Sequence, residues 1–430
     1  MESSREFDIV VLGPTGYTGK YCAEHIVTHL PTNLKWALAG RSTKKIEGVA
    51  QELKKLNPDR LDPGKTMYWC LWSGSADASI EIISVQLNKE ELRSLAERTK
   101  LIINCVGPYH IYSTPVVEAC ANAGTHYVDA TGETPWVKQT VDKYHGTAKS
   151  NGAIIIHCVG IESAPADMLA YALVKEVREK MSCQTKEITG SIYEFKSSGA
   201  SGGTLASILT CIEDFSGSQL LESTKPFALA ASPPPKDIPS ESFVARILGV
   251  RTVRDLGTLT KSPTDFCDMT IIHRSSTLMP ELYGPRFYFR QFLNVRNTFI
   301  GILWNYAFLV GTAFLILAPV RWLVKKAIYA PGSGPTTESG RNDRCEYRAI
   351  ATPDQDTPKR VLGKLKYAGS SMYHFTGVLM AEAAMVILEN EEKVKRVSGG
   401  GIVTPASLGQ EYLDRLENNG CRVETQVLEN

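Results

Sequence analysis

Three glycines at a regular spacing follow the first apolar segment of the chain. Residues 8–12 (DIVVL) are typical of a buried strand, and Gly13, Gly16 and Gly19 come next, at the start of a helical pattern over 18–28. In such a turn the first glycine permits the sharp change of direction, the second lets the backbone approach a pyrophosphate, and the third lets the helix pack closely on the strand. Free N–H groups at the start of the helix attract phosphate. The segment predicts a dinucleotide-binding turn, with a plain tight turn as the alternative.

The end of the second predicted strand indicates which dinucleotide would bind. Residues 35–39 (KWALA) are followed by Gly40, Arg41 and Ser42, with Lys44 nearby. Chains that bind NAD usually place an acidic residue here, which holds the ribose 2′-hydroxyl. An arginine pairs instead with a 2′-phosphate. We therefore expect NADP(H) as the cofactor, although Arg41 could also be a solvated loop cation.

Two later strands end in residues that could face the same ligand, because ligands of open α/β sheets gather at the carboxyl ends of the strands. Residues 101–106 lead into Gly107 and Pro108, a turn that we expect under the ribose and nicotinamide. Residues 126–129 end in Asp129, and Glu133 follows shortly after. Either carboxylate could orient a substrate or an amide. Equally, Asp129 could cap the helix that follows.

Proton donors near this edge are harder to identify from sequence. The candidates are Tyr109, His110 and Tyr112, with Asp129 or Glu133 as orienting groups. We take Tyr109, Tyr112 and Asp129 as the candidate catalytic residues. The two tyrosines could instead be packing aromatics with exposed hydroxyls. No cysteine–histidine spacing typical of zinc is present, so no metal is expected.

Composition limits the classes of protein that remain. The chain has 430 residues and a formal net charge of +1, which favours two or three domains and argues against a nucleic-acid partner. Its ten cysteines are scattered, several inside apolar runs, as expected of reduced thiols in an intracellular protein. The polar start MESSREFD is not a secretory signal. We expect an intracellular protein, cytoplasmic or membrane-associated, that is not secreted.

The first 160 residues alternate between strand and helix patterns, which predicts an α/β fold with a doubly wound parallel sheet. Strands are predicted over 8–12, 35–39, 66–71, 101–106, 126–129 and 153–158, and helices over 18–28, 44–56, 89–99, 114–122 and 136–150. The pattern becomes mixed after about residue 165, with an apolar helix over 375–388. The predicted organisation is a cofactor domain over 1–165, a substrate or dimerisation domain over 166–395, and a tail over 396–430 that returns to the first domain.

Residues 297–320 form an apolar run without a charged residue, flanked by Arg296, Arg321, Lys325 and Lys326. About 20 apolar residues can span a bilayer. Asn305 and Pro319 argue against a span, whereas Trp304 and the glycines are tolerated in membrane helices. The alternatives are a buried helix pair or hairpin that closes a substrate pocket, and association with a membrane or lipid surface.

The chain resembles the saccharopine dehydrogenase-like oxidoreductases, and among them the trans-acting enoyl reductase branch. The resemblance runs over nearly the whole length, and 104–133 is its most specific part. The blocks that carry it are 7–20 (FDIVVLGPTGYTGK), 37–42 (ALAGRS), 104–133 (NCVGPYHIYSTPVVEACANAGTHYVDATGE), 160–167 (GIESAPAD), 201–204 (SGGT), 334–341 (GPTTESGR) and 403–406 (VTPA).

This resemblance implies a Rossmann-type NADP domain joined to a second mixed α/β domain inserted before the C-terminal tail. It also implies that the pyrophosphate faces Gly13, Thr15, Gly16, Tyr17, Thr18 and Gly19. The 2′-phosphate would face Arg41 and Ser42, and the ribose–nicotinamide end would face Val106, Gly107 and Pro108. One departure concerns the loop at 160–163. Relatives typically read Gly-Phe-Asp-Ser, whereas this chain has Ile161 and Glu162, so its substrate could differ.

The leading expectation is an NADPH-dependent reductase of a conjugated C=C or C=N bond in a hydrophobic or carrier-bound biosynthetic intermediate. Such an enzyme could act in trans to a polyketide or lipid synthase, and could form a homodimer. A dehydrogenase of a small polar imine is the second hypothesis, and would need several arginines to hold carboxylates. The third is a non-catalytic NADPH-binding adaptor at a membrane surface.

Overall fold

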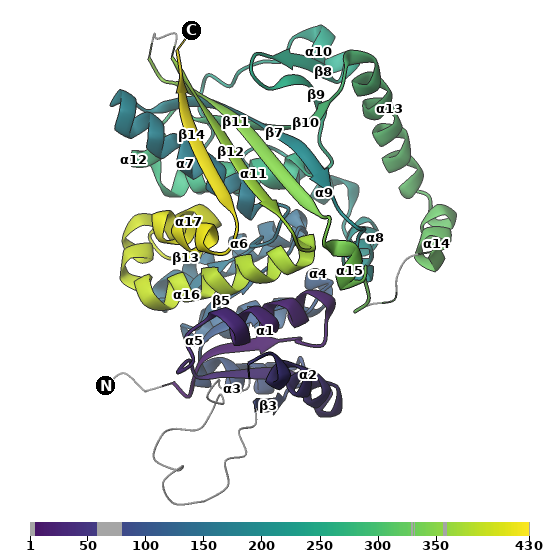
Figure 1. Ribbon diagram of the computed structural model, residues 1–430, viewed down its shortest axis with the longest axis vertical. Coiled ribbons are helices and arrows are strands. Elements are labelled where there is room, and N and C mark those ends of the chain that lie inside the picture. Colours follow the sequence, from purple (N-terminus) through teal and green to yellow (C-terminus); the bar gives the residue numbers. More distant parts are fainter. Residues whose placement is uncertain (1–4, 58–79, 328–329, 331, 356–358, 430) are drawn as a thin grey trace, which may run out of the picture.

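The computed structural model describes residues 5–57, 80–327, 330, 332–355 and 359–429. These residues form two β-sheets, one toward each end of the molecule (Figure 1). The first described strand lies in the first sheet and the last described strand in the second.

The first sheet has the strand order β13-β6-β5-β4-β1-β2-β3, and all of its described pairings are parallel. Its strands are β1 (Phe7–Leu12), β2 (Trp36–Gly40), β3 (Glu81–Ser84), β4 (Thr99–Asn104), β5 (His126–Asp129), β6 (Ile154–Ile156) and β13 (Gly401–Val403). Helices cover both faces. One face packs against α1 (Tyr17–His29), α2 (Thr43–Leu56) and α16 (Met372–Ser398), and the other against α3 (Lys89–Arg98), α5 (Thr114–Ala123) and α6 (Thr134–Ser150).

Burial on both faces explains why these strands are continuous apolar runs. Ile9 and Val11 belong to one hydrophobic cluster and Val10 to the other, and all three are fully buried. The prediction of a doubly wound parallel sheet is confirmed. The strand predicted over 66–71 lies outside the described residues. The strand that pairs with β2 is β3, whose half-buried residues at the sheet edge give a weak apolar pattern.

The second sheet is mixed and has the order β14-β12-β11-β7-β10-β9-β8. Its strands are β7 (Thr185–Lys196), β8 (Val250–Val253), β9 (Gly257–Lys261), β10 (Tyr288–Val295), β11 (Arg344–Pro353), β12 (Arg360–Ala368) and β14 (Arg422–Leu428). β7 and β10 are parallel, and the other pairs are antiparallel. α7 (Ala164–Met181) packs on β11 and β12, and α11 (Asp265–Leu278) packs on β10 and on α7.

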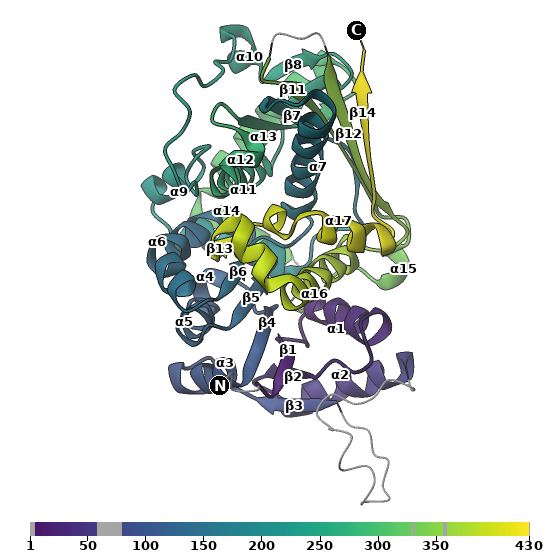
Figure 2. The ribbon, with the colours of Figure 1, turned by 90° about the vertical axis from the view of Figure 1, so that its left-hand side faces the viewer.

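Shorter helices connect these layers. They are α4 (Tyr109–Tyr112), α8 (Gly202–Asp214), α9 (Gly217–Ser223), α10 (Phe243–Leu248), α12 (Pro280–Tyr283), α15 (Thr337–Gly340) and α17 (Gly409–Asn418). α16 and α17 lie at the level between the two sheets, as the two views show (Figure 2).

The chain after residue 370 is divided between the two sheets. α16 lies mostly within the region assigned from sequence to the second domain, yet it packs along α1 and on β4 and β5 of the first sheet. β13 pairs with β6 of the first sheet, whereas β14 pairs with β12 of the second sheet. An apolar helix pattern says nothing about which sheet it covers, which is why the sequence could not place α16.

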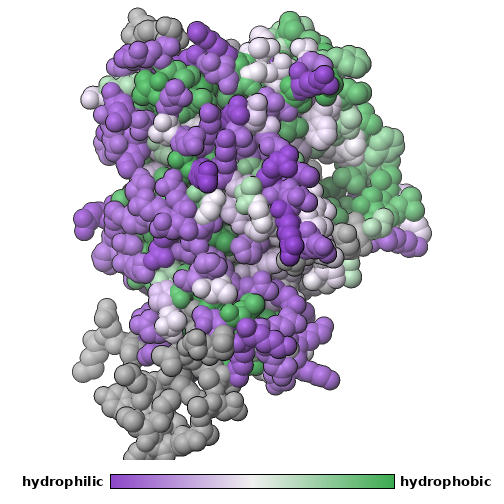
Figure 3. Space-filling view, viewed as in Figure 1, coloured by the Kyte–Doolittle hydropathy of each residue, from purple (hydrophilic) through white to green (hydrophobic). Residues whose placement is uncertain are grey.

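The apolar run over 297–320 is exposed, so the interpretation as a buried helix pair is wrong. It forms α13 (Thr298–Leu315) and the start of α14 (Ala318–Ala327), which project along one side of the molecule (Figure 1). Gly301 and Asn305 are its buried residues, packed against the edge formed by β8, β9 and β10. Phe299 is 76% exposed and Leu303 61%. The space-filling view shows a hydrophobic strip at this edge (Figure 3).

A buried carboxyl joins three elements from both halves of the chain. Asp167, in the first turn of α7, is fully buried. Its Oδ1 accepts a hydrogen bond from Ser275 Oγ of α11 at 2.6 Å, and its Oδ2 accepts one from the backbone N–H of Ala406 at 2.8 Å. Burial raises the pKa of Asp167 from 3.8 to about 7.

Replacement of Asp167 by alanine should weaken this junction. Two buried donors would lose their acceptor, and each such group costs about 1–3 kcal/mol, so D167A should lower the free energy of unfolding by about 2–5 kcal/mol. Urea unfolding followed by tryptophan fluorescence measures the change. The exposed K54A variant serves as the control and should unfold like the wild type.

The same carboxyl predicts a pH dependence of stability. Because burial raises the pKa of Asp167 from 3.8 to about 7, the folded chain binds the proton more tightly than the unfolded chain. The stabilisation is complete below pH 3.8 and is lost as the pH rises through about 7. D167N, which cannot titrate, should flatten this window. Identical pH profiles of unfolding for D167N and wild type would contradict the assignment.

Candidate functional site

The glycine turn leaves β1 at the carboxyl edge of the first sheet and leads directly into α1. Gly13 has a φ of +83°, and a Cβ at this position would lie 2.7 Å from Val106 Cγ2. The N–H of Gly16 donates to the Gly13 carbonyl at 3.1 Å, and no side chain caps the helix. A Cβ on Gly19 would overlap the Gly13 carbonyl oxygen. Gly13 is therefore required by its positive φ and by Val106, and Gly19 by the close approach of backbone to backbone. A Cβ on Gly16 would make only a tight contact of 3.3 Å with the Gly13 carbonyl oxygen.

This turn fits the pyrophosphate of a dinucleotide. α1 starts without a side-chain cap and without an acidic residue in its first turn, so its first N–H groups and its dipole are available to an anion. Thr15 and Thr18 lie in the same turn, half-buried. The ring of Tyr17 packs edge-on against Tyr373 of α16, and its hydroxyl donates to the Pro335 carbonyl.

Arg41 and Ser42 follow the end of β2, at the same edge. Both are exposed, and Ser42 is the residue that precedes α2. Within the described ranges, Arg41 forms no ion pair with a carboxylate. An exposed guanidinium beside a helix start suits a 2′-phosphate, because arginine can bind phosphate through two parallel hydrogen bonds.

The end of β4 lies beside the glycine turn at the carboxyl edge of the sheet. Asn104 at its end is buried, and its side chain donates to Ser113 Oγ at 2.8 Å and to the Tyr127 hydroxyl at 2.9 Å. Its Oδ1 accepts from the N–H of Val106 at 3.1 Å, which holds the start of the Val106–Pro108 turn. Gly107 is exposed at the tip of this turn.

Glu133 organises the segment that follows the turn. Its carboxylate accepts hydrogen bonds from the backbone N–H groups of Tyr109 and His110 at 2.9 and 2.7 Å, and it lies 2.6 Å from His110 Nδ1. His110 Nε2 lies 3.1 Å from Asp214 at the end of α8. Burial by itself lowers the pKa of His110, but the hydrogen bonds and charges of the two carboxylates raise it above its ordinary value. The His110 ring therefore joins the cofactor edge to α8.

Cys211 Sγ lies 3.7 Å from His110 Nδ1, and ligand atoms of Cys211, His110 and Glu133 lie within 4.8 Å of one another. This spacing could hold a metal ion. However, the Glu133 carboxylate already has two backbone N–H groups and the His110 ring as partners, so about three of its four lone pairs are in use.

Asp129 is fully buried at the end of β5 and has four hydrogen-bond partners. Its Oδ2 accepts from the Tyr127 hydroxyl at 2.8 Å and lies 2.7 Å from His157 Nδ1. Its Oδ1 accepts from the N–H groups of Thr131 and Cys158 at 3.1 and 3.2 Å. This geometry suits the orienting role predicted for Asp129, since its carboxylate holds the loops after β5 and β6 in place.

The two candidate tyrosines lie in different environments. Tyr109 is buried, stacks on Trp136, and has its hydroxyl 3.4 Å from the Asn104 carbonyl. Burial raises its pKa well above the ordinary value, so its hydroxyl holds its proton tightly. Tyr112, at the end of α4, is 39% exposed. The sequence could not separate these environments, because both residues lie in one short helix.

Three parts of this edge were missed or only partly anticipated from sequence. Glu162, seen in the sequence only as a departure from relatives, lies beside Gly132. Asp268 of α11 is buried nearby and acts electrostatically on the same group of residues. The segment 332–336 lies over the glycine turn, where Gly334 packs against the Tyr17 ring. The block 334–341 in the resemblance was the signal for this last contact.

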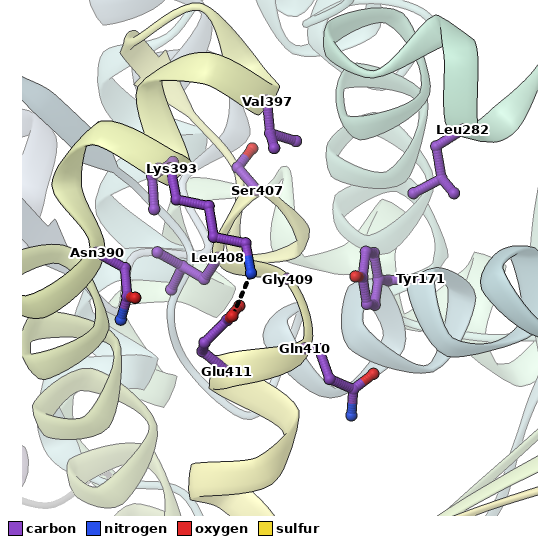
Figure 4. Close-up of a pocket in the computed structure, with 11 residues that line it drawn as sticks. Tyr171, Leu282, Asn390, Lys393, Val397, Ser407, Leu408, Gly409, Gln410 and Glu411 are labelled. Atoms are coloured by element: carbon purple, nitrogen blue, oxygen red, sulfur yellow. Dashed lines mark hydrogen bonds and ion pairs between the residues drawn. The ribbon is translucent and has the colours of Figure 1, made fainter.

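A separate hollow of about 210 Å³ lies between α7, α16 and α17 (Figure 4). Lys393 and Glu411 form an ion pair across it, and Asn390 marks a kink of α16 in its wall. None of the residues predicted for the cofactor or the reaction lines it. The carboxyl edge of the first sheet, rather than this hollow, is therefore the candidate active site.

Comparison with known proteins identifies the family. Residues 9–156 match the family described as the saccharopine dehydrogenase NADP binding domain. A Mycobacterium tuberculosis protein with the provisional name trans-acting enoyl reductase is 31% identical, over 99% of this chain and 98% of its own. A trans-acting enoyl reductase of Mycobacterium ulcerans is 28% identical over 98% of both chains. The chain belongs to the saccharopine dehydrogenase-like oxidoreductases, in the trans-acting enoyl reductase branch.

A solved structure agrees on the fold of this oxidoreductase. Apo saccharopine dehydrogenase (L-Glu forming) from Saccharomyces cerevisiae matches with a TM-score of 0.53 at 12% identity, covering 98% of this chain and 100% of that chain. The family membership makes the chain an NADP-dependent oxidoreductase, and the prediction of NADP(H) is confirmed. The roles of single residues stay predictions.

Arg41 offers a direct test of the cofactor geometry. R41A should weaken NADPH binding by about 10- to 100-fold, since a hydrogen-bonded charge pair contributes about 1.5–3 kcal/mol, and should leave NADH binding almost unchanged. Nicotinamide fluorescence titrations of both cofactors measure this, with K54A on the same helical region as the control. A parallel loss of NADH affinity would show that Arg41 does not read the 2′-phosphate.

Proposed function

We propose that this oxidoreductase reduces a conjugated C=C bond of a hydrophobic, carrier-bound intermediate with NADPH, acting in trans to a separate polyketide or lipid synthase. The observation that carries this proposal is the match over nearly the full length to proteins named trans-acting enoyl reductase. The partner synthase is inferred from that name.

The composition of the cofactor edge favours an acceptor without carboxylates. The loops 104–112, 130–133 and 157–163 contain no lysine or arginine. They carry instead the carboxylates of Glu133 and Glu162. A polar imino acid would bring its own negative charges next to these groups without a lysine or arginine from these loops to pair with them, and burying an unpaired charge is costly. An enoyl thioester has no such charge.

The residues of the chain would divide the work as follows. The bound NADPH would supply the hydride. The glycine turn would hold the pyrophosphate, Arg41 the 2′-phosphate, and the Val106–Pro108 turn the nicotinamide end. The exposed Tyr112 hydroxyl is the candidate to hydrogen-bond the acceptor carbonyl, and the buried carboxylate of Asp129 would keep the loops around the acceptor in register.

This function predicts a clear preference between acceptors. The chain should oxidise NADPH with a long-chain trans-2-enoyl thioester at a kcat/KM at least about 100-fold above that with a dicarboxylic imine, because the latter leaves unpaired buried charges. Loss of nicotinamide absorbance measures both. Y112F should lower the enoyl rate, whereas Y109F should not. NADPH binding without turnover of either acceptor would favour the adaptor hypothesis instead.

We further propose that α13 and α14 lie on a lipid surface. Among the helices that the structure describes, two are long and apolar enough to cross a membrane: α13, whose apolar window is 11% buried, and α16, whose window is 78% buried. Residues 298–327 include no acidic residue, and their charges are Arg321, Lys325 and Lys326 at one end. An exposed apolar helix followed by basic residues and Trp322 is typical of an interfacial helix.

Charged substitutions on α13 test this contact. F299D/L303D should lower binding to vesicles of phosphatidylcholine and phosphatidylserine by about 100-fold, because each buried apolar side chain contributes about 1.5–3 kcal/mol. Both side chains are exposed, so the fold should persist. L221D, at an exposed position of α9, is the matched control. A wild type that elutes as a dimer in size-exclusion chromatography, together with an F299D/L303D variant that elutes as a monomer, would make α13 a protein interface. That result would contradict the lipid contact.

A further inference from the structure

Glu162 lies between the loops after β5 and β6, at the carboxyl edge of the first sheet. It belongs to the loop after β6, whose backbone is fixed at Ile161 by two hydrogen bonds. The Tyr347 hydroxyl donates to the Ile161 carbonyl at 3.0 Å, and the Ile161 N–H donates to Thr376 Oγ1 at 3.3 Å. A Cβ on Gly132 would overlap Glu162 Oε2. The missing side chain of Gly132 thus leaves room for this carboxyl between the loops after β5 and β6.

The carboxyl of Glu162 differs from the other acids of this edge. Asp129 and Glu133 each bind two backbone N–H groups and further side chains. In the part of the chain that the structure describes, neither oxygen of Glu162 accepts a hydrogen bond, and no cation lies beside it. Glu162 is half-buried, so part of the residue stays accessible between the loops after β5 and β6.

The groups that face Glu162 are acids, thiols and a phenol. They come from the loop after β5 (Glu133), its own loop (Cys158), α11 (Cys267, Asp268) and β11 (Tyr347). Burial raises the pKa of Glu162, and the negative charge of Glu133 raises it further. Both effects favour the protonated form of this carboxyl.

We propose that Glu162 is the proton donor of the reduction, an inference that rests on the function proposed above. After hydride reaches the β-carbon of an enoyl thioester, the electron pair of the C=C bond moves to the α-carbon and the carbonyl oxygen. The O–H bond of Glu162 breaks as a C–H bond forms at the α-carbon. Glu162 is left as a carboxylate, and takes a proton from water before the next cycle.

Geometry favours Glu162 over the other groups of this edge. The Tyr109 hydroxyl is buried and directed to the Asn104 carbonyl. His110 is held between two carboxylates, and its ring nitrogens both face them. Asp129 has no free lone pair for a ligand, given its four partners. Glu162 differs from these groups because, among the described residues, its oxygens accept no hydrogen bond and the residue is only half-buried.

The test compares E162Q, E162D and the exposed control E47Q with the wild type, all loaded with NADPH. Infrared difference spectra of wild type minus variant over a pH series should show one carboxylic-acid C=O component lost in E162Q and none lost in E47Q, while the component of Asp167 remains in every protein. NADPH affinity should stay within about twofold in all four proteins. Reduction of crotonyl-CoA should fall by about 100-fold or more in E162Q, as for loss of a general acid, and recover in part in E162D.

Two results would overturn the inference: E162Q turning over crotonyl-CoA within threefold of the wild type (about the scatter of such assays), or an unchanged carboxylic-acid band in E162Q. A wild type that binds NADPH but reduces no enoyl thioester would overturn the proposed function instead. In that case the infrared band still decides whether Glu162 holds a proton beside the cofactor.

Discussion

The position of α1 depends on backbone contacts that only glycine permits, and much of the structure depends on α1. On one side, Gly19 brings the helix against the carbonyl of Gly13, so the helix starts at the sheet edge itself. On the other side, Gly377 of α16 lies so close that a Cβ there would be 2.7 Å from the Cys22 nitrogen. α1 is thus held at closest approach by the sheet and by a helix from the other end of the chain.

This double contact connects the cofactor turn with the second half of the chain. α16 carries Tyr373, whose ring packs on Tyr17 and whose hydroxyl accepts from the Ser201 N–H at 2.7 Å. Ser201 in turn caps α8. A shift of α1 by even a methyl group would therefore move the phosphate turn, α16 and the start of α8 together, since close-packed interiors transmit such changes.

The cofactor half of the site could be predicted from sequence because its determinants are local. The strand, the glycines and Arg41 lie within 34 residues, between 8 and 41, and their spacing alone implies their geometry. The environments of Glu133 and Glu162 could not be predicted. They depend on Asp214, Asp268 and Tyr347, which come from distant elements, and no periodic pattern reports such contacts.

The apolar run over 297–320 is a local pattern whose surroundings could not be predicted from the sequence. Its composition suits a core, a pocket wall or a lipid surface equally, because hydrophobicity does not state what covers a side chain. Its exposure follows from Gly301 and Asn305, the two buried residues of α13. They pack the start of the helix on β8, β9 and β10 and leave the rest of the helix uncovered.

The end of α8 joins two parts of the molecule that are otherwise remote. Glu213 pairs with Arg321 and Lys325 of α14 at 3.2 and 2.7 Å, and the next residue, Asp214, pairs with His110 at the cofactor edge. Two adjacent carboxylates on the last turn of α8 thus link α14 with the cofactor edge. Coupling between two sites is reciprocal. A surface that draws Arg321 and Lys325 away from Glu213 would leave this carboxylate unpaired on the helical turn that carries Asp214. Any change of ligand affinity that this causes at the cofactor edge would be matched by an equal change of affinity for that surface.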